Sequence, residues 1–543
     1  MLEIIRRLPS ILYELINPNI KAFTASREAK VWLISIFVGL FVSVAAILFR
    51  ELILWTQYLW LGIHDETMAS AARKVHWLWI LLTPALGGLL IGWLLNNFLP
   101  AKRTGGVADV IEAKALGGRN IELKSGLGSA IISALSLGFG ASAGREGPMV
   151  HLGATIATSL TTLFNLPDWG RRTLLAAGVA SAVSASFNAP IAGVLFAHEV
   201  ILGHYSKRAF IPIVISSVMG AVLTRLWFGD TLAFSIPDYQ ITSYLEFPAF
   251  ALLGLICAII AVSLEFSIIA TDHVFRSIVM PLWLRPAVGG LLIGAIGVFL
   301  PEILGVGYEA TDLALKNKIP LAIMLALIVA KTLATSVTLA SRFGGGIFSP
   351  SLFIGAMTGG AFGLIASKVF PELASSEGLY AILGMGAVAA AVIGAPISTV
   401  VMVFELTGGY ALSIALLLTV SIAVGINQAV HGRSFFEWQL ELRGLLVHDG
   451  PHRFMMRNTK VADFMSPLEE GENDILDTEG ERPVLRADIN LETALQTFDE
   501  GGFPSLPVVD ANDETRITGW ATQVAALRTF NKALVDMSEE EHH

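Results

Sequence analysis

Long runs of apolar residues alternate with short polar stretches through most of the chain. The runs VWLISIFVGLFVSVAAILF (31–49), WLWILLTPALGGLLIGWLL (77–95) and FALLGLICAIIAVSLEFSIIA (250–270) can each cross a hydrocarbon core of about 30 Å as a helix. Further apolar segments continue to about residue 430. The pattern predicts an all-α, polytopic membrane protein.

One polar interruption lies inside an apolar region. In GASAGREGPMVHLGA (140–154), Arg145 and Glu146 are adjacent and are flanked by glycines. A charge near the bilayer centre costs at least about 2.5–3.5 kcal/mol, so an ionisable residue there marks a functional site by default. We therefore take this pair as the first candidate for function.

The apolar region also contains an internal repeat. FNAPIAGVLFAHE (187–199) corresponds to IGAPISTVVMVFE (393–405), and GPMVHLGA (147–154) corresponds to SPSLFIGA (349–356). The two matches occur in the same order at nearly the same offset, which predicts two structurally related halves. The alternative is chance similarity among segments rich in Ala, Gly and Val.

Glycine and proline interrupt the repeated segments in both halves. The interruptions are SAGREGP (142–148), NAP (188–190), RFGGGIFSP (342–350) and GAP (394–396). Glycine lets backbone N–H groups approach a ligand, and proline in a first helical turn leaves the N-terminal donors free. When the N-termini of several broken helices point at one place, the partial positive charges of their backbone N–H groups form an anion-binding site.

Composition supports a membrane protein and excludes some kinds of site. The 543 residues are 54% hydrophobic and only 15% charged, far less charge than a soluble protein of this length carries. The net charge of −9 says little about the ligand, because much of the acid lies in the stretch 468–481. The single cysteine, Cys257, excludes intramolecular disulfides and cysteine-based metal sites. We predict no metal site.

The basic residues predict how the chain is oriented in the membrane. Residues 1–30 form an amphipathic segment that carries several Lys and Arg residues and lacks the features of a signal peptide. The loop 230–247 has no Lys or Arg, whereas the turns at 102–103 and 207–208 are basic. The positive-inside rule then places the loop outside and the two basic turns in the cytoplasm. We expect both termini of the chain in the cytoplasm as well.

The stretches GREGP (144–148), FNAPIAGVLF (187–196) and GGGIFSP (344–350) together resemble the CLC family of chloride channels and chloride/proton antiporters. The resemblance covers about residues 31–446, with repeats at about 31–228 and 246–430 and a final helix to 446. It implies an inverted-repeat bundle of tilted, broken helices and a homodimer with one pore in each subunit.

The same resemblance implies a function. The chain would transport chloride and similar monovalent anions across a membrane. Its expected location is the bacterial inner membrane, in contact with lipid. Chloride would be its bound substrate ion, with no further cofactor, no enzymatic activity and no nucleic-acid partner. A zinc-protease interpretation of HEVILGH (198–204) fails, because Leu202 stands where that motif needs its second histidine.

The resemblance assigns roles to particular residues. Glu146 matches the family's gating glutamate, whose carboxylate can occupy an anion position and must move or protonate before an anion passes. The matching backbone donors are the amides around Arg145, Glu146 and Gly147 and those of Ile347 and Phe348. The side chain of Arg145 either acts on the anion through its field or pairs structurally with an acid or with carbonyl groups.

Two polar groups of the family's anion site are missing. In TGGVAD (104–109), Gly105 replaces a serine that usually contacts the central anion, Gly106 follows it, and Ala108 replaces a proline. The family's inner tyrosine aligns with Phe436, or one residue away with Phe435. Each lost neutral hydrogen bond is worth about 0.5–1.5 kcal/mol, so we predict a weaker central site with looser discrimination among anions.

A third departure concerns protons. Val200 occupies the position where antiporters of the family generally carry an internal, proton-relaying glutamate. This favours passive, channel-like conduction, with a chloride/proton antiporter lacking that acid as the alternative. His198 and Glu199 are the nearest titratable groups for a proton path, and both could instead be hydrogen-bonded inside the bundle.

The segment 447–543 reads as a cytoplasmic tail with one CBS-like motif at about 458–532. KVADFMSP (460–467) resembles its lead-in strand. The spacing of Leu491, Ala494, Leu495 and Phe498 predicts one apolar helical face. Nucleotide binding is doubtful, because Ala525 replaces an aspartate often used for the ribose, and we favour a tail that stabilises the dimer.

Overall fold

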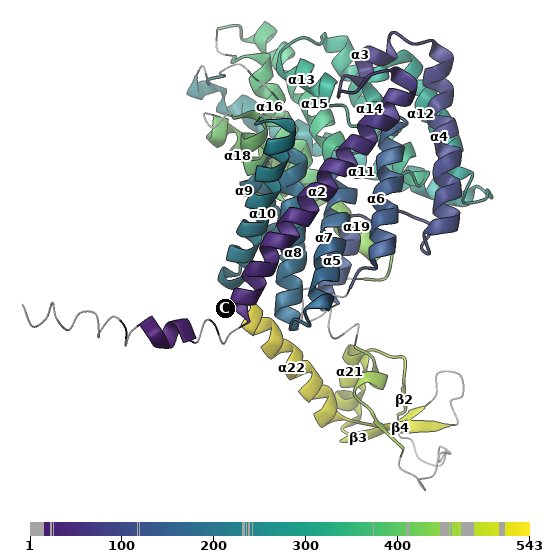
Figure 1. The fold of residues 1–543 in the computed structure, drawn as a ribbon, viewed down its shortest axis with the longest axis vertical. Helices are drawn as coiled ribbons and strands as arrows, with labels where there is room; N and C mark the ends of the chain where they lie inside the picture. Colours follow the sequence, from purple (N-terminus) through teal and green to yellow (C-terminus); the bar gives the residue numbers. More distant parts are fainter. Residues whose placement is uncertain are drawn as a thin grey trace, which may run out of the picture. The chain divides into compact units, whose positions relative to one another are not determined.

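The computed structural model describes most of the chain (Figure 1). The residues outside the description are 1–12, 14–15, 22–23, 25–26, 117, 119, 231–233, 235, 237–238, 242, 373, 409–411, 446–455, 457–458, 469–482, 510–515 and 543. Much of the predicted N-terminal segment, much of the loop 230–247 and nearly all of the acidic stretch 468–481 therefore lie outside it. The chain forms two compact units, Met1–Phe436 and Glu437–His543. The boundary predicted from the sequence follows residue 446.

The first unit is built from helices. In chain order they are α2 (Glu28–Leu61), α3 (Met68–Ala72), α4 (Trp77–Phe98), α5 (Val107–Ala115), α6 (Leu123–Gly138), α7 (Glu146–Leu163), α8 (Asp168–Phe187), α9 (Pro190–Phe196), the π-helix η1 (Ala197–Leu202), α10 (Lys207–Phe228), η2 (Tyr244–Glu246), α11 (Phe247–Ser277), α12 (Arg285–Phe299), η3 (Pro301–Ile303), α13 (Tyr308–Leu315), α14 (Leu321–Ala340), α15 (Phe348–Val369), α16 (Glu377–Ile393), α17 (Pro396–Thr407), α18 (Ser413–His431) and α19 (Phe435–Glu441), which continues into the second unit. Within the described residues, seven helical segments are long and apolar enough to cross a membrane. The predicted all-α, polytopic class is confirmed.

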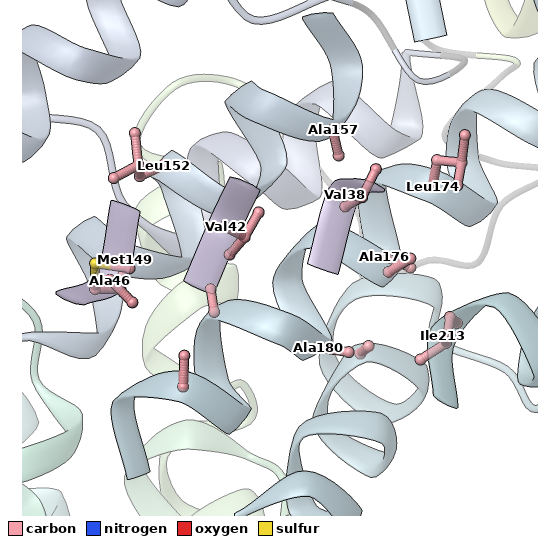
Figure 2. Close-up of a cluster of buried hydrophobic side chains, with 14 of the residues drawn as sticks. Val38, Val42, Ala46, Met149, Leu152, Ala157, Leu174, Ala176, Ala180 and Ile213 are labelled. Carbon is pink, nitrogen blue, oxygen red and sulfur yellow. The ribbon is translucent and has the colours of Figure 1, made fainter. Parts of the chain in front are cut away.

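Small residues let the helices of the core approach closely. Figure 2 shows an apolar cluster formed by Val38, Val42 and Ala46 of α2, Met149, Leu152 and Ala157 of α7, Leu174, Ala176 and Ala180 of α8, and Ile213 of α10. Between α7 and α8, a Cβ on Gly178 would lie 2.4 Å from the carbonyl oxygen of Gly153. The second half has the same contact between α15 and α16, where a Cβ on Gly384 would lie 2.4 Å from the oxygen of Gly355. Glycine pairs of this kind are typical of membrane helix interfaces.

The backbone repeats where the sequence repeats. Ala189 precedes Pro190 at the start of α9 with φ −126° and ψ 78°. Ala395 precedes Pro396 at the start of α17 with φ −130° and ψ 74°. Proline suits a first helical position, because its missing N–H would have no partner there. The two segments that match in sequence therefore also match in conformation.

Contacts between these segments show that the repeat is inverted. Glu199 accepts hydrogen bonds from the amides of Ile397 and Ser398, at the start of α17, at 3.0 and 2.7 Å. Glu405, in the last turn of α17, accepts hydrogen bonds from two amides at the start of α9, also at 3.0 and 2.7 Å. Each segment thus ends where the other begins, so the two run antiparallel. This pair of corresponding segments therefore runs in opposite directions.

The second unit is a small α/β fold. Its elements are η5 (Val461–Asp463), β1 (Ser466–Pro467), β2 (Leu485–Arg486), α21 (Leu491–Gly501), β3 (Ser505–Val509), β4 (Ile517–Thr522) and α22 (Gln523–His542), and its strands lie in the order β1-β4-β3-β2. Strand β3 pairs antiparallel with β4 and parallel with β2.

Two sequence predictions for the second unit can be compared with this fold. On α21, Leu491, Ala494 and Phe498 are buried and Leu495 is half-buried, as the helical spacing predicts. The predicted strand over 460–467 is shorter than expected. Asp463 accepts a hydrogen bond from the amide of Lys460 at 2.9 Å and closes a 3₁₀ turn there, so only two residues pair as a strand.

Candidate functional site

The starts of two helices, one from each half, meet inside the first unit. Helix α7 begins at Glu146 after Arg145, and α15 begins at Phe348 after Ile347. The loops before them are joined by an antiparallel bridge, in which the amides of Gly144 and Gly346 each donate to the other's carbonyl oxygen at 2.7 Å. The partial positive charge of both helix starts is therefore concentrated in one buried region.

The carboxylate of Glu146 lies at the start of α15. Glu146 is 5% exposed. The Ser349 hydroxyl donates to one of its oxygens, and the Ser349 amide donates to the other at 3.4 Å. A side chain of the first half is thereby held by the helix start of the second half. This is the position in which a helix N-terminus binds a free anion.

The hydrogen bonds of the Arg145 side chain go to groups other than this carboxylate. Its Nη1 lies 3.0 Å from Oε1 of Glu66, and its Nη2 donates to the carbonyl oxygen of Ser186 at 2.8 Å. Its guanidinium also lies 4.9 Å from the centre of the Tyr308 ring. These contacts support the structural role that the sequence left open for this side chain.

Gly105 packs directly against an imidazole. Its amide donates to the hydroxyl of Ser129 at 3.1 Å, and a Cβ placed on it would lie only 2.3 Å from Nε2 of His151 on α7. His151 is 4% exposed. The missing serine side chain at residue 105 thus leaves space that the His151 ring occupies. The next residue, Gly106, lies directly before α5 at its N-cap, and its amide donates to Asp109 at 2.8 Å.

Aromatic rings lie beside the start of α15 and at the start of α19. The rings of Phe187 and Phe348 meet edge to face, with centroids 5.2 Å apart. Phe187 ends α8 and Phe348 begins α15, so this contact also joins the two halves. Phe436 is buried, and its ring packs against that of Phe435 with centroids 6.1 Å apart.

With this geometry in view, comparison with known proteins identifies the family. Residues 87–428, more than half of the chain, match the family described as "Voltage gated chloride channel". The chain belongs to the CLC family. A chloride channel protein of Ralstonia nicotianae described as ClcB-like is 32% identical over 383 residues, which are 69% of this chain and 88% of the relative. The H(+)/Cl(-) exchange transporter ClcA of Klebsiella pneumoniae is 28% identical over 422 residues, which are 76% of this chain and 88% of that protein.

A solved CLC structure has the same fold. The crystal structure of a slow cyanobacterial Cl⁻/H⁺ antiporter aligns with a TM-score of 0.69 at 23% identity and covers 77% of this chain and 99% of that chain. At this identity the likeness shows the fold alone. The chain is an integral membrane protein of the CLC fold with a small α/β tail.

The residues predicted for a proton path have structural partners. Both carboxylate oxygens of Glu199 accept amides of α17. The ring of His198 stacks on Tyr205 with centroids 5.4 Å apart, and its Nδ1 lies 3.2 Å from the carbonyl oxygen of His204. The neighbouring Val200, where CLC antiporters generally carry their internal glutamate, lies in the π-helix η1. These contacts support the structural alternative for His198 and Glu199.

Sequence reasoning missed three side chains of the site. One signal was available for Ser349, since the repeat places it opposite Gly147 beside the gate candidate. For His151 and Glu66 there was none, because a histidine in an apolar helix and an acid in a loop both have common structural explanations.

Proposed function

We propose that this CLC protein conducts chloride and similar monovalent anions through a pore gated by Glu146. One observation carries the proposal: the Glu146 carboxylate lies at the start of α15 and accepts hydrogen bonds from the hydroxyl and the amide of Ser349. Chloride and a carboxylate are both monovalent anions that accept N–H and O–H hydrogen bonds. An anion can take this place when the carboxylate leaves it.

Passive conduction is the mode we favour. Val200 cannot carry a proton, and the carboxylate of Glu199 is hydrogen-bonded to two backbone amides. The alternative is chloride/proton exchange without the internal glutamate, and relatives named as a channel and as an exchanger both resemble this chain. In either mode Glu146 is the residue that moves.

We further propose that His151 takes over the role of the missing serine at the central anion. Its imidazole occupies the space beside Gly105 that a side chain at residue 105 would need. A ring N–H is a hydrogen-bond donor of the kind that the serine hydroxyl supplies elsewhere in the family. The remaining donors are the amides of Ile347 and Phe348, and Phe436 adds none through its side chain.

Flux measurements in liposomes test the gate. Glu146→Gln removes the negative charge and keeps the shape, so we expect faster chloride flux that no longer depends on pH. Glu122→Gln changes an exposed acid that makes no capping hydrogen bond at the start of α6, and it serves as the matched control. Unchanged flux in Glu146→Gln would overturn the assignment of the gate.

A second measurement separates the two modes. Reversal potentials are recorded under a chloride gradient, with and without a pH gradient. Passive conduction predicts that the pH gradient leaves the reversal potential unchanged. A shift, or chloride-driven uphill proton movement, would establish the antiporter instead.

The assembly and location belong to the same proposal. We propose a homodimer with one pore per subunit in a bacterial inner membrane, with both termini in the cytoplasm. The tail would stabilise that dimer rather than bind nucleotide. At the start of α22 the Thr522 hydroxyl accepts a hydrogen bond from the amide of Ala525 at 3.1 Å, and the alanine side chain offers no ribose contact.

A further inference from the structure

A small cavity lies beside Arg145, and Glu146 is not among the residues that line it. Its volume is about 40 Å³, and its lining includes Arg50, Glu66, Arg145, Glu302 and Tyr308. A single water needs about 10–15 Å³ by the same kind of measure, so the cavity has room for a small anion. The lining comes from α2, the loop after it, α3, the α7 start, η3 and the residues after it, and α13.

Inside this cavity one carboxylate oxygen is shared by two guanidinium groups. Oε1 of Glu66 lies 3.0 Å from Nη1 of Arg145 and 3.1 Å from Nε of Arg50. Partial burial disfavours the charged form of Glu66, but the charges of Arg145 and Arg50 outweigh it and lower the pKa of this loop carboxyl. Glu66 is therefore ionised at neutral pH and acts as a bound anion.

The two arginines are held in place by other contacts. The Arg50 guanidinium lies 4.1 Å from the centre of the Phe228 ring. Arg145 is held by the carbonyl oxygen of Ser186 and by the ring of Tyr308. The two basic groups thus have supports that do not depend on Glu66, so they would stay in position after it moves.

The other acids of the cavity have partners of their own. Glu302 forms an ion pair with Arg73. Glu309 accepts hydrogen bonds from the amides of Ala69 and Ser70, at 2.9 and 3.1 Å, at the start of α3. Glu66 is therefore the acid of this cavity that neutralises Arg50 and Arg145.

Glu66 also has a route out of the cavity. It lies in the loop between α2 and α3, and its side chain is 35% exposed, compared with 9% for Arg145. The carboxylate can turn toward solvent by changing its side-chain rotamer, without moving the backbone. A free anion can then bind the guanidinium groups of Arg50 and Arg145 that the Glu66 carboxylate has released.

We propose that Arg50 and Arg145 form an outer binding site for a small monovalent anion, and that Glu66 occupies this site until an anion displaces it. Since Arg145 is followed directly by Glu146, the outer site lies next to the gate. An anion entering from this side would exchange first with Glu66 and then with Glu146. This order rests on the proposed function, whereas the outer site itself does not.

Crystals soaked in bromide test the site directly, because bromide is located by its anomalous scattering. We expect bromide between Arg50 and Arg145 in Glu66→Gln and none in Glu66→Gln/Arg50→Gln. Glu51→Gln is the matched control, since Glu51 is an acid near the same end of α2 that pairs with His64 and does not line the cavity. No bromide in correctly folded Glu66→Gln would overturn the site.

Flux gives the second measurement. In liposomes, Glu66→Gln should reach half-maximal flux at a chloride concentration about tenfold lower, because a charge-assisted competitor has been removed. Adding Arg50→Gln should reverse this gain. If bromide binds but neither the wild type nor any variant conducts, the proposed function fails and the outer site stands. If the wild type conducts and the chloride dependence of Glu66→Gln is unchanged, the outer site has no role in transport and the proposed exchange order is wrong.

Discussion

Glu199 and Glu405 cap each other's segments: Glu199 caps α17, which contains Glu405, and Glu405 caps α9, which Glu199 follows. Glu199 follows α9 and accepts the first amides of α17, while Glu405 lies in α17 and accepts the amides of Ile191 and Ala192 in α9. Because the two contacts have the same pattern and the same lengths, they join the halves through an approximate two-fold relation. The acid at position 199 therefore has a structural partner in the repeat.

This two-fold relation predicts that removing either carboxylate lowers the stability of the protein by the same amount. Glu199→Ala and Glu405→Ala should each lower the free energy of unfolding by about 1–2 kcal/mol, as expected when a helix start loses its side-chain acceptor. Thermal unfolding in detergent measures the change. Glu122→Ala, which removes an exposed acid that makes no capping hydrogen bond at the start of α6, should leave stability nearly unchanged. A loss confined to one of the two variants would contradict the two-fold relation.

The glycine contacts between α7 and α8 and between α15 and α16 predict a second symmetric effect. A Cβ on Gly178 or Gly384 would meet a backbone oxygen at 2.4 Å, which a side-chain adjustment cannot relieve. Gly178→Ala and Gly384→Ala should each cost about 1–3 kcal/mol through overpacking.

Gly425 offers the matched control for these two variants. It lies inside α18, and a Cβ there would meet nothing within 4 Å. Gly425→Ala should therefore be neutral or slightly stabilising, because alanine is the better helix former by about 1 kcal/mol. Similar unfolding temperatures for all three variants would show that the close contacts do not limit stability.

The approach of His151 to Gly105 predicts a coupling between these residues. Gly105→Ser would place its Cβ 2.3 Å from Nε2 of the buried ring, so we expect a loss of about 1–3 kcal/mol. His151→Ala should remove that steric conflict. The double variant Gly105→Ser/His151→Ala should therefore lose less stability than the sum of the losses of the two single variants.

Anion binding completes this test. Calorimetry should show weaker chloride binding in His151→Ala, and binding should recover in Gly105→Ser/His151→Ala, where a serine hydroxyl replaces the ring. If His151→Ala binds chloride as tightly as the wild type, the imidazole is not a ligand of the central anion.

The class of fold and the presence of a repeat follow from local features of the sequence, whereas the inversion of the repeat was implied by the family resemblance and is shown by the contacts of Glu199 and Glu405. Apolar runs long enough to span a bilayer predict the helices, and proline after Ala189 and Ala395 predicts two matching helix starts. These signals are read from neighbouring residues, since helix starts depend on the first turn. The tail strands β1 and β2 lack such a signal, because two paired residues leave almost no periodic pattern.

The side-chain contacts of the site could not be predicted in the same way. His151 meets Gly105 across 46 positions of the chain, and Arg50, Glu66 and Arg145 come together from three separate segments. Such contacts depend on how the helices pack, and each residue alone has an ordinary structural explanation. The resemblance to the CLC family supplied Glu146 as the proposed gate, but not the neighbours that hold its carboxylate.

The Ser349 hydroxyl provides the last test, since it donates to the carboxylate of Glu146. A hydrogen bond to a charged group is worth about 1.5–3 kcal/mol, so Ser349→Ala should let the carboxylate leave more often and raise chloride flux about tenfold. Ser349→Thr keeps the hydroxyl and should conduct like the wild type. In a Glu146→Gln background, Ser349→Ala should add little, because the charged acceptor is already gone. An equal gain in both backgrounds would mean that the hydroxyl acts on the pore by another route than the gate.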